Sequence, residues 1–115
     1  MLFIYYPKCS TSLKAKKFLM NHHLEFQERH IVDQKLSKEE LLHLYHKSGL
    51  PLKKFFNTSG KIYKENHLKD KLPDMDEEQQ LELLASHGML VKRPILETED
   101  KVLVGFKESE YNSLL

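Results

Sequence analysis

The stretch LFIYYPKCSTS, residues 2–12, passes from an apolar run into a short polar loop. The run from Leu2 to Tyr6 is almost continuously apolar and aromatic and stops at Pro7, which is typical of a strand buried on both faces of a sheet. From Ser12 to about His23, apolar residues recur at helical spacing with lysines between them. The stretch therefore predicts a strand, a tight loop and a helix.

The segments that follow predict a second strand and two capped helices. Residues 26–32 become increasingly apolar and predict a strand parallel to the first, because a single short helix joins the two. Ser37-Lys38-Glu39-Glu40 and Asp76-Glu77-Glu78-Gln79 both place a capping side chain three residues before Glu or Gln. They predict helices that end at Gly49 and Gly88, respectively.

The remaining segments are shorter. They predict a short helix from Pro51 through Phe56, a loop at 57–60 and a helical turn at 68–72. Residues 91–96 and 101–106 predict a β-hairpin around a turn at 97–100, and residues 107–115 predict a last helix. The order strand, helix, strand, several helices, hairpin and helix predicts an α/β thioredoxin-like fold. We expect one domain over residues 1–115, with a helical insertion at about 37–88.

The composition of the chain disfavours several classes of function. The 115 residues contain 18 Lys+Arg and 17 Asp+Glu, a net charge of +1, which disfavours direct nucleic-acid binding. Hydrophobic residues make up 40%, as in a globular domain. The N-terminus shows no signal-peptide pattern, no run is long enough to span a membrane, and the single cysteine suits a reducing compartment. We expect a cytoplasmic monomer with no membrane association.

Cys9 is the candidate nucleophile. It lies between the first predicted strand and helix, where free backbone amides and the helix dipole favour an anion, and Lys8 adds a positive neighbour. All three lower the pKa of a thiol. The alternative is that Cys9 is only a small buried apolar residue.

Ser12 occupies the position three residues after Cys9, where a two-thiol oxidoreductase carries its second cysteine. A hydroxyl can hydrogen-bond a thiolate but cannot resolve a mixed disulfide, so any turnover needs an external thiol. Ser10, Thr11 and Ser12 are equally good helix N-cap residues.

Arg93 and Pro94 open the first hairpin strand. Proline occurs where a strand begins, at a sheet edge, or in the cis form where backbone faces a ligand. Arg93 is expected to project beside the Cys9 loop, unless it is an ordinary solvated charge.

Two further groups of residues could bind ligands. The chain has seven histidines, among them His43 and His46 on one predicted helix face. No Cys or carboxylate is placed to complete a tetrahedral site, so we expect no metal. Lys53 and Lys54 form a phosphate or partner patch, or simply the lysine face of an amphipathic helix.

The chain resembles the arsenate reductase family with a thioredoxin fold over essentially its whole length. The resemblance rests on PKCSTS at 7–12, NTSG at 57–60 and VKRPIL at 91–96. That family includes glutaredoxin-coupled arsenate reductases, Spx-type transcription regulators and small thiol reductases of unassigned substrate, to which this chain is most similar.

The resemblance implies that Cys9 is the nucleophile, Arg93 binds an oxyanion and Pro94 is a cis proline facing the thiol. Arsenate reductases surround the oxyanion with three arginines, but here one of these positions is Asn57 and another falls near Gly105-Phe106. We therefore expect weak arsenate binding, because each lost bidentate contact removes roughly 1.5–3 kcal/mol. Spx-type regulators mostly carry a two-cysteine switch, which Ser12 removes.

Two hypotheses follow. In the first, the chain is a monothiol oxidoreductase: Cys9 attacks a small thiol adduct, a protein disulfide or an oxyanion. We expect no bound cofactor, and an external reductant, either a small thiol such as glutathione or glutaredoxin, regenerates the Cys9 thiolate. Lys8, Ser10, Thr11, Ser12, Asn57, Arg93 and Pro94 are the expected substrate-binding residues. In the second, the chain is an Spx-like regulator that binds RNA polymerase without catalysis.

Overall fold

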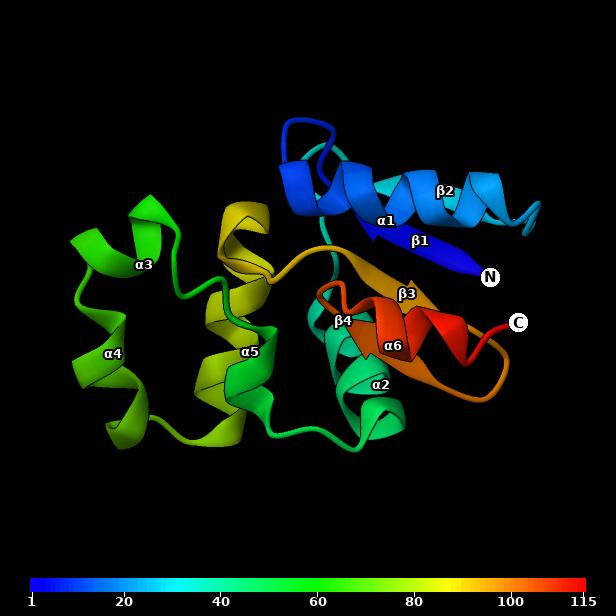
Figure 1. Cartoon of the computed structure of the whole chain (residues 1–115). Helices are drawn as coiled ribbons and strands as arrows, with labels where there is room; N and C mark the ends of the chain where they lie inside the picture. The colour runs from blue at the N-terminus through cyan, green and yellow to red at the C-terminus, as the bar shows by residue number, and fades with distance from the viewer.

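The computed structural model describes all residues 1–115 and shows an α/β fold around a mixed four-stranded sheet (Figure 1). The strands are β1 (Leu2–Tyr5), β2 (Gln27–His30), β3 (Ile95–Glu97) and β4 (Val102–Val104), in the order β2-β1-β3-β4. β1 pairs with β2 in parallel and with β3 in antiparallel, and β3 pairs with β4 in antiparallel. The predicted parallel pair and the hairpin are both confirmed.

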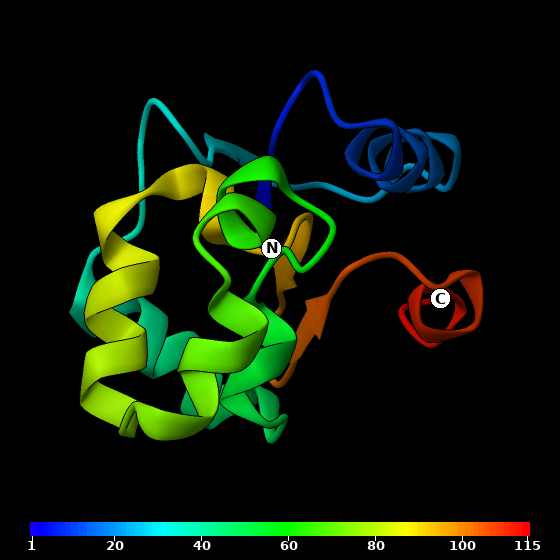
Figure 2. The same ribbon diagram turned by 90° about the vertical axis from the view of Figure 1, so that its left-hand side faces the viewer.

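Helices cover both faces of the sheet, as Figure 2 shows. α1 (Ser10–Asn21) and α6 (Glu108–Asn112) lie on one face, and α2 (Lys38–Ser48) and α5 (Glu77–Ser86) pack together on the other. β1 serves both faces because successive side chains of a strand point to opposite sides. Phe3 belongs to the core under α1 and α6, whereas Ile4 belongs to the larger core under the insertion.

The insertion consists mainly of short helices. η1 (Leu52–Phe55) and α4 (Leu68–Lys71) match predicted segments, and η2 (Leu72–Asp74) carries the chain through Pro73, where the predicted turn was expected to stop. α3 (Lys61–Glu65) was not predicted because no residue in it is buried. Such a segment leaves no apolar stripe in the sequence.

The two predicted capping boxes are present, but the two helix ends differ from each other. Ser37 and Asp76 each accept a hydrogen bond from the third residue of their helix, whose side chain bonds back to the cap. α2 ends as predicted at Gly49, which adopts a left-handed φ of 69°. α5 instead ends at Ser86, and Gly88 begins η3 (Gly88–Leu90). A Cβ on Gly88 would clash with the Ile31 carbonyl, so this glycine permits close packing rather than a helix stop.

Several strand and helix limits were predicted wrongly. β2 and β3 are shorter than expected, Glu97 lies in β3 rather than in the turn, and α1 begins at Ser10 rather than Ser12. Val91 forms only an isolated bridge with Phe56. Because Arg93-Pro94 separates Val91 from β3, the predicted strand is split there.

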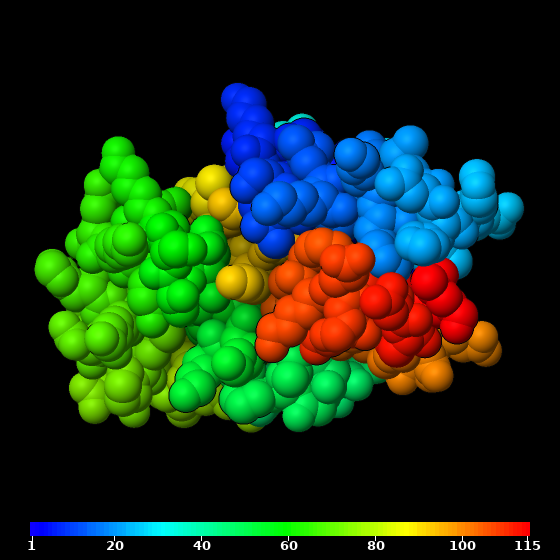
Figure 3. All heavy atoms as spheres, viewed as in Figure 1, coloured from blue at the N-terminus to red at the C-terminus, as the bar shows by residue number.

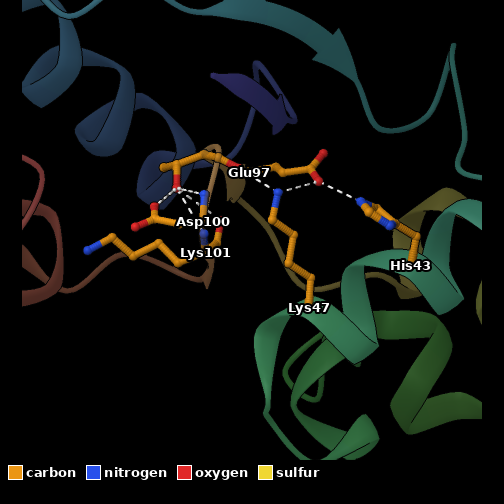
Figure 4. A network of polar contacts seen from close by, with 6 residues as sticks. His43, Lys47, Glu97, Asp100 and Lys101 are labelled. Atoms are coloured by element: carbon orange, nitrogen blue, oxygen red, sulfur yellow. Dashed lines mark hydrogen bonds and ion pairs between the residues drawn. The ribbon is translucent and has the colours of Figure 1, made fainter.

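A network of hydrogen bonds and ion pairs joins the hairpin end of the sheet to α2 (Figure 4). Glu97 Oε2 lies 2.7 Å from His43 Nε2 and 3.0 Å from Lys47 Nζ, and Lys47 also donates to the Thr98 carbonyl at 2.6 Å. In the turn, the Thr98 hydroxyl accepts hydrogen bonds from the amides of Asp100 and Lys101. These contacts fix the position of β3, whose other end carries Arg93-Pro94.

Candidate active site

Cys9 is the N-cap residue of α1, at the point where the chain leaves β1. Its amide donates to the Tyr6 carbonyl at 2.9 Å, and its carbonyl accepts from the Leu13 amide at 3.0 Å. These bonds hold the backbone on both sides of the residue, and the thiol is partly buried. The predicted junction of strand and helix is confirmed, and Cys9, rather than a serine or threonine, occupies the cap.

The surroundings lower the pKa of the Cys9 thiol below its ordinary value. Burial is the largest single influence and raises the pKa. Hydrogen bonds from the Ser12 amide and hydroxyl and from the Thr11 amide, together with the charge of Arg93, outweigh it. A lowered pKa increases the thiolate fraction near neutral pH, and the thiolate is the nucleophilic form. The expected direction is therefore present.

Ser12 is fully buried, and its hydroxyl interacts with the Tyr6 amide and with the Cys9 thiol. Its oxygen accepts a hydrogen bond from the Tyr6 amide at 3.3 Å, and its interaction with the thiol is one of the causes that lower the Cys9 pKa. Ser12 is therefore not an N-cap residue, which was one of the two readings of the sequence. It connects the end of β1 to the thiol.

Arg93 lies beside this loop, as predicted. Its guanidinium carbon is 5.3 Å from the centre of the Tyr6 ring, in a cation–π arrangement. Nη1 donates to the carbonyls of Met89 at 3.1 Å and Val91 at 3.3 Å, while the buried Nε has no hydrogen-bond partner. The guanidinium is thus held in place, and its Nη2, which makes no hydrogen bond within the chain, remains as a donor for a ligand.

Pro94 follows Arg93 through a cis peptide bond, immediately before β3. It is buried, and its carbonyl accepts a hydrogen bond from the Gly105 amide at 2.8 Å. The cis bond agrees with what the family resemblance implies, and the position also agrees with a proline at a strand start.

Asn57 comes from the insertion but lies next to Arg93. Its amide donates to the Leu90 carbonyl at 2.7 Å, and its side-chain Nδ2 donates to the Met89 carbonyl at 3.5 Å, the oxygen that Arg93 also uses. A Cβ on Gly60 would lie 2.6 Å from Nδ2, so the glycine leaves room for this side chain. The structure thus brings together two residues 36 positions apart in the sequence.

The other candidate residues are less closely involved. Lys8 and Ser10 are exposed, and the positive charge that lowers the Cys9 pKa most is that of Arg93. Thr11 contributes its amide. The seven histidines do not gather with Cys9 or with acids into any group of three that could hold a metal ion.

Sequence reasoning missed Tyr6 and the Met89 carbonyl. Tyr6 supplies the ring beneath Arg93 and the carbonyl that holds the Cys9 amide. Because Tyr6 is an aromatic residue at the end of an apolar run, nothing in the sequence distinguishes it from a core residue of the strand. The Met89 carbonyl is a backbone atom, whose role no sequence pattern could indicate.

The ArsC family model matches residues 4–114. A protein of Bacillus subtilis named YusI is 59% identical over 96% of this chain and 94% of its own length. This match and the family model cover the Cys9 loop, the insertion and the Arg93-Pro94 segment together.

The chain belongs to the ArsC family. A crystal structure from Bacteroides fragilis, described as related to this family, is 54% identical and superposes with a TM-score of 0.96 over 99% of this chain and 96% of that one. A protein of Oceanobacillus iheyensis named global transcriptional regulator Spx 2 is 31% identical over 97% of this chain and 82% of its own length. The thioredoxin-like fold and the family resemblance predicted from the sequence are confirmed. None of the helices is both long and apolar enough to cross a membrane.

Proposed function

We propose that this protein is a thiol-dependent oxidoreductase in which Cys9 is the nucleophile. The observation that carries the proposal is a thiol of lowered pKa at the start of α1, influenced by an arginine whose Nε has no partner. A structural cysteine needs neither feature. A thiol of lowered pKa beside a cation is typical of functional sites.

In the proposed reaction, the Cys9 thiolate attacks one sulfur of a disulfide. A Cys9 mixed disulfide forms, and the other sulfur leaves as a thiolate that takes up a proton. Because Cys9 is the only cysteine, no second thiol of the chain can displace the bound group. An external thiol attacks the mixed disulfide, restores the Cys9 thiolate and carries away the first group, and a second external thiol reduces that product.

Arg93 and Asn57 would bind an anionic group of the substrate beside Cys9. The guanidinium is fixed by Tyr6 and by two carbonyls, so little side-chain entropy is lost when a carboxylate or oxyanion binds. Asn57 contributes a neutral amide where the arsenate reductase pattern has an arginine. We therefore propose the disulfide of a carboxylate-bearing thiol compound as the substrate in preference to arsenate.

The first test is the alkylation rate of Cys9 by iodoacetamide as a function of pH. We expect the midpoint to lie below the value of ~8.5 for a free cysteine, because the hydrogen bonds and Arg93 favour the anion. A midpoint at or above that value would contradict the proposal. Cys9→Ser is the matched control: it should remove alkylation and all turnover while leaving the melting temperature nearly unchanged.

The second test is turnover. Wild type should reduce small disulfides with glutathione, glutaredoxin or another small thiol as the reductant, and Cys9→Ser should not. Arsenate belongs in the same panel and is expected to be a poor substrate. Absence of turnover with every acceptor and every thiol would exclude the enzymatic function.

A second candidate function is transcriptional regulation through RNA polymerase. The observation that favours it is the 31% identity to the protein named global transcriptional regulator Spx 2. A binding assay with purified polymerase separates the two functions. If the protein is a regulator, wild type and Cys9→Ser should bind polymerase equally well. If it is the proposed oxidoreductase, neither should form a stable complex with polymerase.

A further inference from the structure

A groove of about 420 Å³ is lined partly by residues that are sequence neighbours of Asn57 and Arg93. Its lining includes Lys53 and Lys54 of η1, Lys92, and Lys107 at the start of α6. Figure 3 shows the surface here recessed between the insertion and the β4–α6 segment, with the chain around residue 90 at its bottom. This volume is in the range of small-molecule and peptide sites.

The four lysines share an unusual property. None of their ammonium groups forms an ion pair or a hydrogen bond, whereas Lys16, Lys38, Lys47 and Lys61 are each paired with a glutamate. Glu110 is the only acid in the groove lining. Four unpaired cations around one recess produce a positive potential that favours a negatively charged ligand.

The charge is concentrated in this part of a nearly neutral chain. Residues 53–71 contain six lysines and two acids, while the rest of the chain contains 12 basic and 15 acidic residues. At the other end of the sheet, a second groove is lined by Glu25, Glu97 and Glu99. The molecule therefore has a positive end and a negative end.

The groove lining includes sequence neighbours of the residues assigned to substrate binding. Lys92 immediately precedes Arg93, Thr58 of the lining immediately follows Asn57, and the Lys92 amide donates to the Phe55 carbonyl at 2.7 Å. Apolar side chains also line it: Leu50, Phe56, Tyr63 and Val104. A ligand that fits this lining carries acidic and apolar groups together.

We propose that this groove binds an acidic segment of a protein partner, and that this partner presents the disulfide or mixed disulfide to Cys9. The second clause rests on the proposed function, whereas binding in the groove does not. An acidic peptide supplies both carboxylates for the lysines and apolar side chains for the partly exposed Leu50, Tyr63 and Val104. Charge complementarity of this kind mainly accelerates association and selects partners.

Nucleic acid fits the groove less well. Nucleic-acid binding draws on a long basic surface, but here Glu110 interrupts the lysines and the opposite end of the molecule is acidic. The cations are all lysines from three separate segments, without the arginine forks that recognise phosphates bidentately. A peptide with spaced carboxylates matches this distribution better than a continuous polyanion.

The test uses the reduced full-length protein and a short fluorescein-labelled peptide of alternating glutamate and leucine without cysteine. We expect saturable binding that weakens with salt. Lys53→Glu combined with Lys54→Glu should weaken binding by at least about tenfold, because two attractions become repulsions. The matched control is Lys17→Glu combined with Lys35→Glu, which makes the same change of charge at two exposed lysines outside the groove. It should change the affinity by less than about twofold.

Three outcomes would overturn the proposal. The first is no binding of the acidic peptide, or equal binding of the same peptide with glutamine in place of glutamate. The second is equal weakening by both lysine pairs, which would show a general charge effect. The third is tighter binding of a single-stranded oligonucleotide with the same dependence on Lys53 and Lys54. Circular dichroism of each variant shows whether it is folded, and Lys53→Gln with Lys54→Gln replaces the reversed pair if that pair is not.

The same preparations separate this proposal from the proposed function. Cys9 alkylation and turnover of a small neutral disulfide by wild type report on the thiol alone. Peptide binding without thiol reactivity would support the binding groove and contradict the oxidoreductase function. Thiol reactivity without peptide binding would support the oxidoreductase function and contradict the binding groove.

Discussion

The two ends of β3 hold their polar groups in different ways. At the hairpin end, Glu97 is bonded to both His43 and Lys47, and the Thr98 hydroxyl is shared between two amides of the turn. Burial alone would raise the pKa of Glu97, but the hydrogen bonds from His43 and Lys47 and the charge of Lys47 outweigh it and lower that pKa. This network joins α2 to the sheet and pairs the Glu97 carboxylate.

At the Arg93 end, polar groups remain unsatisfied. Arg93 Nε is buried without a partner, and Lys92 next to it belongs to a set of unpaired cations. A buried unpaired donor costs stability, roughly 1–3 kcal/mol, so such groups are rare in folded proteins. One end of the strand therefore pairs its charged side chain within the fold, while the other keeps unpaired polar groups beside the candidate active site. Substitutions should therefore affect stability at the first end and reactivity at the second.

The largest expected effect is that of Arg93→Ala on catalysis. If Arg93 binds an anionic group beside Cys9, its loss should lower kcat/KM for an anionic disulfide about ten- to a hundred-fold, since a charge-assisted contact of roughly 1.5–3 kcal/mol disappears. The Cys9 pKa should also rise, because the Arg93 charge helps to lower it. Steady-state kinetics with an anionic and a neutral disulfide measure the two effects separately.

Arg93→Lys is the matched control for charge. It should recover only part of the loss, because lysine keeps the positive charge but not the forked donors. The neutral disulfide should lose activity only as far as the thiolate fraction falls. Equal losses on both disulfides would show that Arg93 acts on the thiol alone, and the proposed anion site would be wrong.

A smaller effect is expected from Ser12→Ala. The hydroxyl that interacts with the thiolate is lost, so the Cys9 pKa should rise. The alkylation rate at neutral pH should fall a few-fold, and by no more than about tenfold. The Tyr6 amide also loses its acceptor, which should cost roughly 1 kcal/mol of stability. The pH profile of alkylation and a denaturant melt provide the two values.

Ser12→Thr is the matched control, because it retains the hydroxyl. A profile close to that of wild type, in a variant that remains folded, would assign the effect to the hydrogen bond. An unchanged midpoint in Ser12→Ala would show instead that backbone amides and Arg93 set the Cys9 pKa by themselves.

The sequence predicted the reactive end better than the structural end. An apolar strand ending in PKCSTS has strong local chemistry, and the resemblance connected it to Arg93, Pro94 and Asn57 across about 80 residues. The contacts that place them end on backbone carbonyls: that of Leu90 accepts from the Asn57 amide, and that of Met89 accepts from the Asn57 side chain. Backbone atoms are identical in every residue, so a sequence pattern cannot show them.

The network at the hairpin end could not be predicted for a different reason. His43 and Lys47 are one helical turn apart and Glu97 is about 50 residues further on, so only the tertiary fold brings them together. Glu97 looked like part of a polar turn because its neighbours are Thr98, Glu99 and Asp100. The same uncertainty of short segments made β2 and β3 appear longer than they are.

The smallest expected effect tests the hairpin end directly. Glu97→Gln keeps the size of the side chain but removes the charge that His43 and Lys47 contact, and it should cost roughly 1 kcal/mol of unfolding free energy. Because the Glu97 pKa is lowered in the folded state, its contribution is complete above the ordinary value of 4.5 and is lost as the pH falls through the lower folded value. The difference in unfolding free energy between wild type and variant should therefore be constant near neutral pH and shrink under acid, as denaturant melts at several pH values can measure. Cys9 alkylation should be unchanged, since Glu97 lies at the opposite end of β3 from Arg93. A change in the alkylation profile would show that the two ends are coupled and would break the division of roles proposed here.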